Sequence, residues 1–239
     1  MSTTTSSTQR PPAYPVNLEI AGLPALVVGG GPVAARKAAG LIRSGAQVTV
    51  VAPEIIDDLR DNPSIRCIER TYQRGEAASY RVVISATGRK EIDSQVSRDA
   101  QATGIPVNSA DDPGNCSFTL PAIARAGEIQ VTVSTSGRSP AMATWLRDRV
   151  AETLDQSMVD TLELLARVRS EVIAAGQSTE VLAWRRALDA GLVELIADGQ
   201  HEAAEKLLRA ELGADGLHTG ASAAASVTTE ELEVSGGIR

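Results

Sequence analysis

The chain has few aromatic residues, few cysteines and few histidines. Aromatic residues make up 3% of its 239 residues, which argues against a surface that stacks the bases of single-stranded nucleic acid. The cysteines, Cys67 and Cys116, and the histidines, His201 and His218, are far apart in the sequence, so they form no metal-ligand spacing. A net charge of −7 also disfavours nucleic acid. We therefore expect neither a bound metal ion nor a nucleic-acid partner.

Long apolar runs are absent as well. No run approaches the roughly 18 apolar residues of a membrane span. The first 13 residues, MSTTTSSTQRPPA, lack the apolar stretch of a secretory signal. We expect no membrane association and a cytoplasmic location, whose reducing conditions suit unpaired thiols. Residues 1–13 are expected to be a disordered leader, and residues 214–239, rich in Gly, Ala, Ser and Thr, a disordered tail.

What the chain does contain is a globular composition, with 43% hydrophobic and 22% charged residues. Between residues 14 and 112, short apolar runs alternate with helical patterns. Continuous apolar strands of this kind are typical of a parallel sheet with both faces covered, so the sequence predicts an α/β fold. The predicted strands are 25–29, 47–52, 65–70, 81–86 and 105–108, and the predicted helices are 33–44 and 93–103.

The second half of the chain has a different pattern. Residues 118–123 and 128–134 read as strands around a turn at 125–127, which indicates a hairpin or an added pair of strands. Ser139 followed by Pro140 marks the start of a helix. Apolar residues then recur at helical spacing over 141–212, and glycines divide this region into about four helices.

The most informative local motif is Val27-Val28-Gly29-Gly30-Gly31-Pro32-Val33-Ala34. It matches the G-x-G-x-x-A pattern with Gly29, Gly31 and Ala34 in the three small positions. The first glycine permits a tight turn, the second lets backbone amides approach a pyrophosphate, and the third small residue lets helix and strand pack closely. Because the motif follows a strand and opens a helix, it predicts dinucleotide binding; a purely structural glycine turn is the alternative.

The acidic residue that usually binds the ribose hydroxyls is missing from the end of the second predicted strand. That strand ends in Val51-Ala52-Pro53, and Glu54 beyond it is a partial substitute. No basic cluster follows that would attract a 2′-phosphate. The sequence therefore favours NAD over NADP.

Two polar segments follow later strands. Asn108 and Asp111 come after the last strand of the sheet, where ligands bind in parallel sheets, although Asn and Asp are also ordinary turn residues. Residues 134–140, STSGRSP, offer hydroxyls, the cation of Arg138 and a helix N-terminus. This segment either holds anionic groups or caps the helix that follows it.

Taken together, these segments resemble the precorrin-2 dehydrogenase family, which includes the N-terminal half of bacterial siroheme synthase. The motifs that carry the resemblance are the stretch from Tyr14 to Pro53, ISAT at 84–87, VNSADDPGNCSFTLPA at 107–122 and VTVSTSGRSPAMATWLRDRV at 131–150. The resemblance runs from residue 14 to about residue 154, with weaker helical agreement to residue 212.

This resemblance implies an NAD-binding Rossmann domain over 14–113, a small β-containing dimerisation region over 114–140 and a helical domain over 141–213. It implies a homodimer that oxidises precorrin-2 to sirohydrochlorin with NAD, on the route to siroheme or cobalamin. In some members the same pocket also inserts ferrous iron into sirohydrochlorin.

The resemblance also implies roles for individual residues. Asp111 falls on the family's catalytic carboxylate, and Asp112 occupies the next position. Precorrin-2 has eight carboxylates, so Arg36 and Lys37 are further candidates for binding it, unless they are solvated helix residues. The cofactor contacts expected are Gly29, Gly31, Pro32, Val33, Pro53, Glu54, Ala86, Thr87 and Asn108, and the substrate contacts are Ser134, Thr135 and Arg138.

Two rival classes share some of these features. An NAD-sensing regulatory module of a channel or transporter has the glycine turn, but it usually keeps an acid at the end of the second strand. A chelatase with a vestigial Rossmann domain would bind the tetrapyrrole without oxidising it.

Overall fold

The computed structural model describes residues 13–110, 112–180 and 183–213. The described residues form two compact units. The first comprises the described residues up to Ala122 together with Ser134–Ser139, and the second comprises Ile123–Val133 together with the described residues from Pro140 onward. The expected leader, apart from Ala13, and the expected tail lie outside the described residues.

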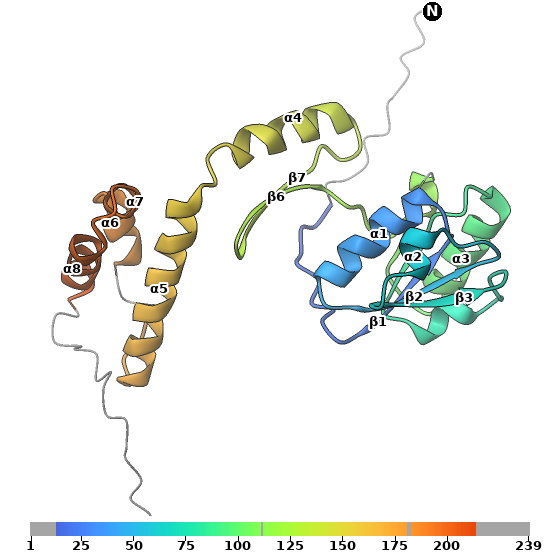
Figure 1. The fold of residues 1–239 in the computed structure, drawn as a ribbon, viewed down its shortest axis with the longest axis horizontal. Coiled ribbons are helices and arrows are strands. Elements are labelled where there is room, and N and C mark those ends of the chain that lie inside the picture. Colours follow the sequence, from blue (N-terminus) through green and yellow to red (C-terminus); the bar gives the residue numbers. More distant parts are fainter. Residues whose placement is uncertain (1–12, 111, 181–182, 214–239) are drawn as a thin grey trace, which may run out of the picture. The chain divides into compact units, whose positions relative to one another are not determined.

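The first unit is built on a five-stranded parallel sheet with strand order β3-β2-β1-β4-β5 (Figure 1). The central strand β1 pairs with β2 and β4, so that Val28 lies opposite Val51 on one side and Ser85 on the other. The predicted α/β fold is confirmed. The strands are β1 (Pro24–Val28), β2 (Gln47–Ala52), β3 (Ile65–Glu69), β4 (Val82–Ser85) and β5 (Val107–Ser109).

Helices cover both faces of this sheet because alternate residues of each strand point to opposite sides. Ala25 and Val27 of β1 share one hydrophobic cluster with α1 (Pro32–Arg43) and α2 (Asp57–Arg60). Leu26 and Val28 share another with α3 (Lys90–Ala102). Two short 3-10 helices, η1 (Glu76–Ser79) and η2 (Pro113–Asn115), complete this unit. The sequence pattern did not predict α2, η1 or η2.

The second unit begins with a small two-stranded sheet, β6 (Ala122–Ala126) and β7 (Ile129–Val133), joined at Gly127. The φ angle of Gly127 is 52°, a left-handed value that favours glycine. The predicted strands at 118–123 and 128–134 are thus only partly right. Phe118 instead packs against the hydrophobic cluster beside α1 in the first unit.

Five helices follow in the described part of the second unit: α4 (Pro140–Ala151), α5 (Gln156–Ala174), α6 (Trp184–Asp189), α7 (Leu192–Ala197) and α8 (His201–Leu212). The helix start predicted at Pro140 is confirmed. A core that includes Leu164 and Val168 of α5, Leu192 of α7 and Leu208 of α8 joins four of these helices. None of the helices in the described residues is long and apolar enough to cross a membrane.

The boundaries of the units differ from the predicted domain boundaries. The expected dimerisation region, 114–140, is divided between the two units: its residues up to Ala122 and Ser134–Ser139 belong to the first, and Ile123–Val133 and Pro140 belong to the second. Ser117 Oγ accepts a hydrogen bond from the backbone N–H of Val107, which ties this segment to β5. The central part, with β6 and β7, packs with the helices, and α4 lies against β7.

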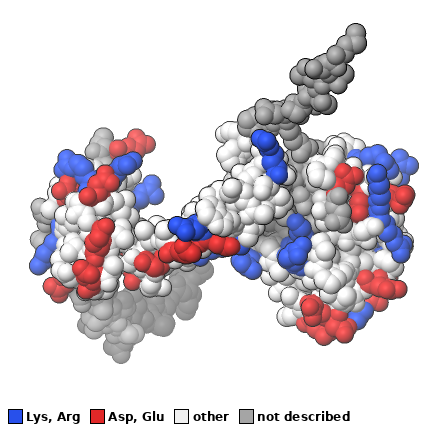
Figure 2. All heavy atoms as spheres, turned by 90° about the horizontal axis from the view of Figure 1, so that it is seen from above, with Lys and Arg blue, Asp and Glu red and all other residues white. Residues whose placement is uncertain are grey.

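Charged side chains of both signs occur on each unit (Figure 2). In the helical unit they form a network between α5 and α8. Glu205 lies 2.8 Å from Arg167 and 2.7 Å from Arg209, and Arg209 also lies 2.8 Å from Glu171. Hydrogen bonds from both guanidinium groups lower the pKa of Glu205 to about 2.

Candidate functional site

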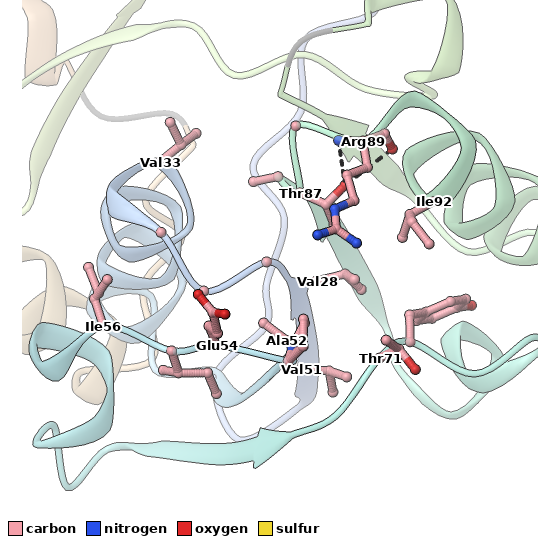
Figure 3. A pocket seen from close by; sticks show the side chains of 18 of the residues that line it. Val28, Val33, Val51, Ala52, Glu54, Ile56, Thr71, Thr87, Arg89 and Ile92 are labelled. Carbon is pink, nitrogen blue, oxygen red and sulfur yellow. Dashed lines mark hydrogen bonds between the residues drawn. The ribbon is translucent and has the colours of Figure 1, made fainter.

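A pocket of about 610 Å³ opens at the carboxyl ends of the parallel strands in the first unit (Figure 3). Its walls are the segments that follow β1, β2, β3 and β4. This is the edge at which open α/β sheets bind their ligands, beside the helix that follows the first strand. The described lining residues are Val28–Val33, Val51–Ile56, Thr71, Tyr72, Ala86–Arg89 and Ile92.

Gly29 and Gly30 form the floor, where backbone packs directly against backbone. A Cβ atom added at Gly29 would lie 2.2 Å from the carbonyl oxygen of Ala86, and one at Gly30 would lie 1.9 Å from that of Glu54. Gly29 also adopts a φ of 130°, and its N–H donates to the carbonyl of Val51 at 3.0 Å. Only glycine can occupy these two positions without displacing a neighbouring strand end.

Gly31 has a different role from the two glycines before it. It is the N-cap of α1, its φ is an ordinary −96°, and a Cβ added there would meet no atom within 4 Å. Pro32 follows at the first helical position. The bare backbone of Gly31 therefore leaves open space in front of the unpaired N–H groups of a helix N-terminus. That combination fits the pyrophosphate of a dinucleotide, which needs close approach and hydrogen-bond donors.

The second wall is a turn from Ser85 to Arg89 that is held by one buried carboxylate. Asp93, 5% exposed, accepts hydrogen bonds from the hydroxyl of Ser85, from the hydroxyl of Thr87 at 2.8 Å and from the N–H of Thr87 at 3.2 Å. The hydroxyl of Thr87 in turn accepts from the N–H of Arg89 at 3.0 Å. The turn is thus anchored to the first turn of α3.

The third wall includes the ring of Tyr72, which follows β3. Its hydroxyl donates to Asp99 at 2.9 Å and accepts from the N–H of Ala77 at 3.2 Å. Burial is the main cause that raises the pKa of Tyr72 well above its ordinary value of 10. The phenol therefore stays protonated, and its two hydrogen bonds hold the ring at the pocket wall.

Two charged side chains line the pocket from opposite sides. Glu54 lies on the β2 side, and the guanidinium of Arg89 extends over the pocket from the β4 side (Figure 3). Among the described lining residues, Arg89 is the only Lys or Arg and Glu54 the only Asp or Glu. The lining is otherwise apolar or neutral, as small-molecule sites generally are.

The structure brings together all but one of the residues predicted to contact the cofactor. Asn108 is the exception: it does not line the pocket, and it is 6% exposed. Its side-chain amide donates to the carbonyl of Phe118 at 3.0 Å, which fastens β5 to the segment that follows. Its Oδ1 atom has no hydrogen-bond partner among the described residues. The predicted residues that do line the pocket are Gly29, Gly31, Pro32, Val33, Pro53, Glu54, Ala86 and Thr87.

Asp111, the predicted catalytic residue, lies outside the described residues. Its neighbour Asp112 is described and has structural partners. The Asp112 carboxylate accepts from the N–H of Gly114 at 2.9 Å and from the side-chain amide of Asn115 at 3.1 Å. The thiol of Cys116 donates to the carbonyl of Ser109 at 3.2 Å. Asp112 therefore holds the turn that follows β5.

The predicted substrate contacts Ser134, Thr135 and Arg138 lie in the turn before α4 and not among the described lining of the pocket. The Thr135 hydroxyl accepts from the N–H of Ser139 at 3.2 Å, and Ser136 has a φ of 53°. Arg138 is exposed. The hydrogen bond between Thr135 and Ser139 closes a turn directly before α4 in the sequence.

Thr71, Tyr72, Arg89 and Ile92 line the pocket but were not predicted from the sequence. The missed signal was the position of Arg89, two residues after the ISAT segment, at the end of a strand adjacent to β1. As for metals, no group of three or more His, Cys, Asp or Glu side chains within the described residues is arranged to hold an ion.

Comparison with known proteins agrees with this geometry. Residues 16–122 match the family described as "Putative NAD(P)-binding", and residues 127–153 match the family described as "Sirohaem biosynthesis protein central". The siroheme synthase of Methylococcus capsulatus is 37% identical over 202 residues, which are 81% of this chain and 42% of that protein. The siroheme synthase of Nitrosococcus oceani is 36% identical over 203 residues, 83% of this chain and 43% of that protein. The chain thus spans less than half the length of these relatives.

A solved structure named "SirC, precorrin-2 dehydrogenase" has the same fold, with a TM-score of 0.60 over 84% of this chain and 98% of that one, at 23% identity. The predicted use of a nicotinamide dinucleotide agrees with the match to the NAD(P)-binding family. The order of the two matched regions is the one expected from the sequence motifs. The chain is thus similar to siroheme synthase over 81% of its own length, and it carries the NAD(P)-binding and the sirohaem biosynthesis regions one after the other.

Proposed function

We propose that this protein oxidises precorrin-2 to sirohydrochlorin with NAD, in the biosynthesis of siroheme or cobalamin. The observation that carries the proposal is the pocket built on Gly29–Gly31, in a chain similar to siroheme synthase over 81% of its length. When bound, NAD supplies the acceptor for a hydride equivalent. The oxidation removes a hydride and a proton from the substrate, so the protein must orient the macrocycle and give the proton a destination.

The cofactor's phosphates are assigned to the space beside Gly31 and the N-terminus of α1. Glu54, at the end of β2, is assigned to the hydroxyls of the adenosine ribose. A 2′-phosphate at that position would meet the negative charge of Glu54. This is our reason for proposing NAD as the preferred cofactor over NADP.

Asp111 is proposed as the base that takes the proton, or as the group that orients the macrocycle. It follows β5, whose end lies beside that of β4 in the sheet. In this strand order the β5 side is opposite to Glu54, as is required if the adenosine lies over β2 and the reacting ring over β5. Ser134, Thr135 and Arg138 are proposed to contact the substrate's carboxylates, with Arg36 and Lys37 as further candidates.

A homodimer is also proposed. The sheet formed by β6 and β7 has only two strands, and such a sheet usually needs a partner to cover its edges. On the neighbouring α4, Met142, Trp145 and Leu146 are exposed by 49%, 56% and 38%. These apolar side chains and strand edges support pairing with a second copy. We expect light scattering at micromolar concentration to give twice the 25.0 kDa of the chain.

Insertion of ferrous iron into sirohydrochlorin is a second candidate activity, with the iron as substrate. We further propose a cytoplasmic location, in which Cys67 and Cys116 stay reduced. A regulatory NAD-sensing module is not favoured, because the similarity to siroheme synthase extends beyond the NAD-binding region into α4.

The deciding experiment is anaerobic incubation of the full chain with precorrin-2 and NAD. We expect NADH and sirohydrochlorin to form in equal amounts. Binding of NADH without turnover would instead support a regulatory module. Consumption of sirohydrochlorin with ferrous iron, but no NADH from precorrin-2, would support a chelatase that does not oxidise.

A further inference from the structure

Arg89 is a cation whose role the proposed function does not explain. It belongs to the described lining of the pocket, and its guanidinium is turned toward the pocket's interior (Figure 3). Its side chain forms no ion pair with a carboxylate of the described residues. Two other arginines of this unit do have such partners: Arg70 pairs with Glu76 at 2.6 Å, and Arg60 pairs with Glu69 at 2.8 Å. An arginine without a carboxylate partner beside a pocket is available for an anionic ligand.

The backbone of Arg89 is fixed even though its side chain is exposed. Its N–H donates to Thr87 Oγ1 at 3.0 Å, and its carbonyl accepts from the N–H of Asp93 at 3.0 Å. It is also the N-cap of α3, a helix of 13 residues. The guanidinium therefore extends from a stable anchor, and less freedom is lost when it binds a ligand than for a side chain on a loose loop.

The ligand beside Arg89 is identified by the rest of the lining. All of the described lining comes from the ends of β1 to β4 or from the segments after them, and none of it comes from β5. In this strand order, that is the half of the site that takes the adenosine and the pyrophosphate. The Tyr72 ring and Ile92 supply apolar surface for a flat base. Gly31 opens the space for the phosphates.

We propose that Arg89 binds the pyrophosphate of the dinucleotide, across the pocket from Glu54. The recognised chemical class is a nucleoside diphosphate, so ADP-ribose alone should carry the features that Arg89 contacts. This inference rests on the proposed cofactor site. It adds that the positive charge for the phosphates comes from the turn after β4, in addition to the amides of the glycine turn.

A charge in this position should make cofactor binding depend on salt. The guanidinium of Arg89 is exposed, so ions in solution screen its attraction for the phosphates. The amide donors at Gly31 and the helix N-terminus depend less on ionic strength because they act at contact distance. The contribution of Arg89 should therefore be largest at low salt.

The test uses the full chain with Arg89→Gln, which keeps most of the stem and removes the charge, and Arg89→Lys, which keeps the charge without the planar fork. Arg66→Gln is the matched control, because Arg66 is exposed on β3 and does not line the pocket. Dissociation constants for NADH, NADPH, ADP-ribose and adenosine are measured by calorimetry at low and high salt. Circular dichroism confirms that each variant is folded.

We expect Arg89→Gln to weaken the binding of NADH and of ADP-ribose by the same factor, roughly 10-fold at low salt, as for the loss of one charge-assisted hydrogen bond. Arg89→Lys should weaken the binding of both ligands less than Arg89→Gln does, and neither variant should change the binding of adenosine. High salt should reduce the difference in affinity between the wild type and Arg89→Gln. Unchanged binding of NADH and ADP-ribose overturns the inference, as does a loss confined to NADPH, which would place Arg89 at a 2′-phosphate. An equally large weakening of adenosine binding also overturns the inference. Failure of the wild type to bind NADH would instead contradict the proposed function itself.

Discussion

Oδ1 of Asp93 lies 2.8 Å from the hydroxyl of Thr87, so a buried carboxylate on α3 supports a residue that lines the pocket. The same oxygen accepts from Ser85, which is fully buried. Asp93 is thus a positioning residue: it does not line the pocket itself, but it sets the shape of the turn that carries Thr87 and Arg89. Removing this carboxylate should therefore lower the free energy of unfolding more than it lowers the rate of the reaction.

Asp93→Ala should lower the free energy of unfolding by about 3 kcal/mol, because it removes a charged acceptor and leaves the Ser85 hydroxyl buried without a partner. Urea unfolding followed by circular dichroism measures the change. Glu91→Ala is the control, since Glu91 is exposed in the same first turn of α3. A loss for Asp93→Ala no larger than that of the control would show that the turn does not depend on this carboxylate.

Gly31→Ala should fold normally and bind NADH weakly. The added methyl meets no protein atom within 4 Å and the backbone conformation is unstrained, so stability should change little. The methyl would, however, stand where the pyrophosphate is expected to approach, and binding should weaken by about 10-fold or more. Gly30→Ala is the contrasting variant, because its methyl would lie 1.9 Å from the Glu54 carbonyl. That variant should be strongly destabilised, and a stable Gly30→Ala would contradict the packing described here.

Asp111→Asn should reduce turnover of precorrin-2 by roughly 10²- to 10⁴-fold if the carboxylate accepts the proton, with little change in NADH affinity. Asp112→Asn is the control. The Asp112 carboxylate caps a turn by accepting from the Gly114 N–H, an interaction that asparagine can also make. Near-normal turnover in the first variant with loss in the second would move the catalytic role to Asp112. If one pocket serves both reactions, Asp111→Asn should also lower the rate of any iron insertion.

Glu54→Gln should reduce the discrimination against NADPH. Glu54 is the only acidic residue among the described pocket lining, and removing its charge removes the repulsion of a 2′-phosphate. We expect the ratio of the NADPH and NADH dissociation constants to fall by about 10-fold. Titration of the fluorescence of each reduced cofactor gives both constants. A wild type that binds NADPH more tightly than NADH would contradict the assigned preference from the outset.

Acid should weaken the helical unit through Glu205. Arg167 and Arg209 lower the pKa of this carboxyl from its ordinary 4.5 to about 2 in the folded state. Its stabilising contribution is therefore complete above pH 4.5 and is lost as the pH falls toward 2. The difference in urea midpoint between wild type and Glu205→Gln should be constant near neutral pH and shrink over this acidic range. Fluorescence of Trp184, which packs on the core of this unit, follows the transition in a Trp145→Phe background. A difference that does not change with pH would contradict the assigned pairing.

Much of the sheet was predictable because its signals are local. The apolar runs that form β1 and β2 are continuous, since both faces of these strands are buried. The glycine turn was equally readable, because Gly29 and Gly31 meet demands that arise within a few residues of chain. The start of α4 at Pro140 followed from local capping chemistry in the same way.

The sequence by itself determined the α/β class, the glycine turn and eight of the nineteen described residues that line the pocket, because each depends on neighbours in the chain. Only the tertiary structure placed Arg89 and Tyr72 in that pocket and left Asn108 out of its lining. Arg89 is far from Val51 in the sequence, and it reaches the same pocket only because the strand order of the whole sheet sets β4 beside β1. The burial of Asp93 under the Thr87 turn is of the same kind: an acidic residue in the first turn of a helix is usually exposed, and here the packing of α3 on the sheet encloses it.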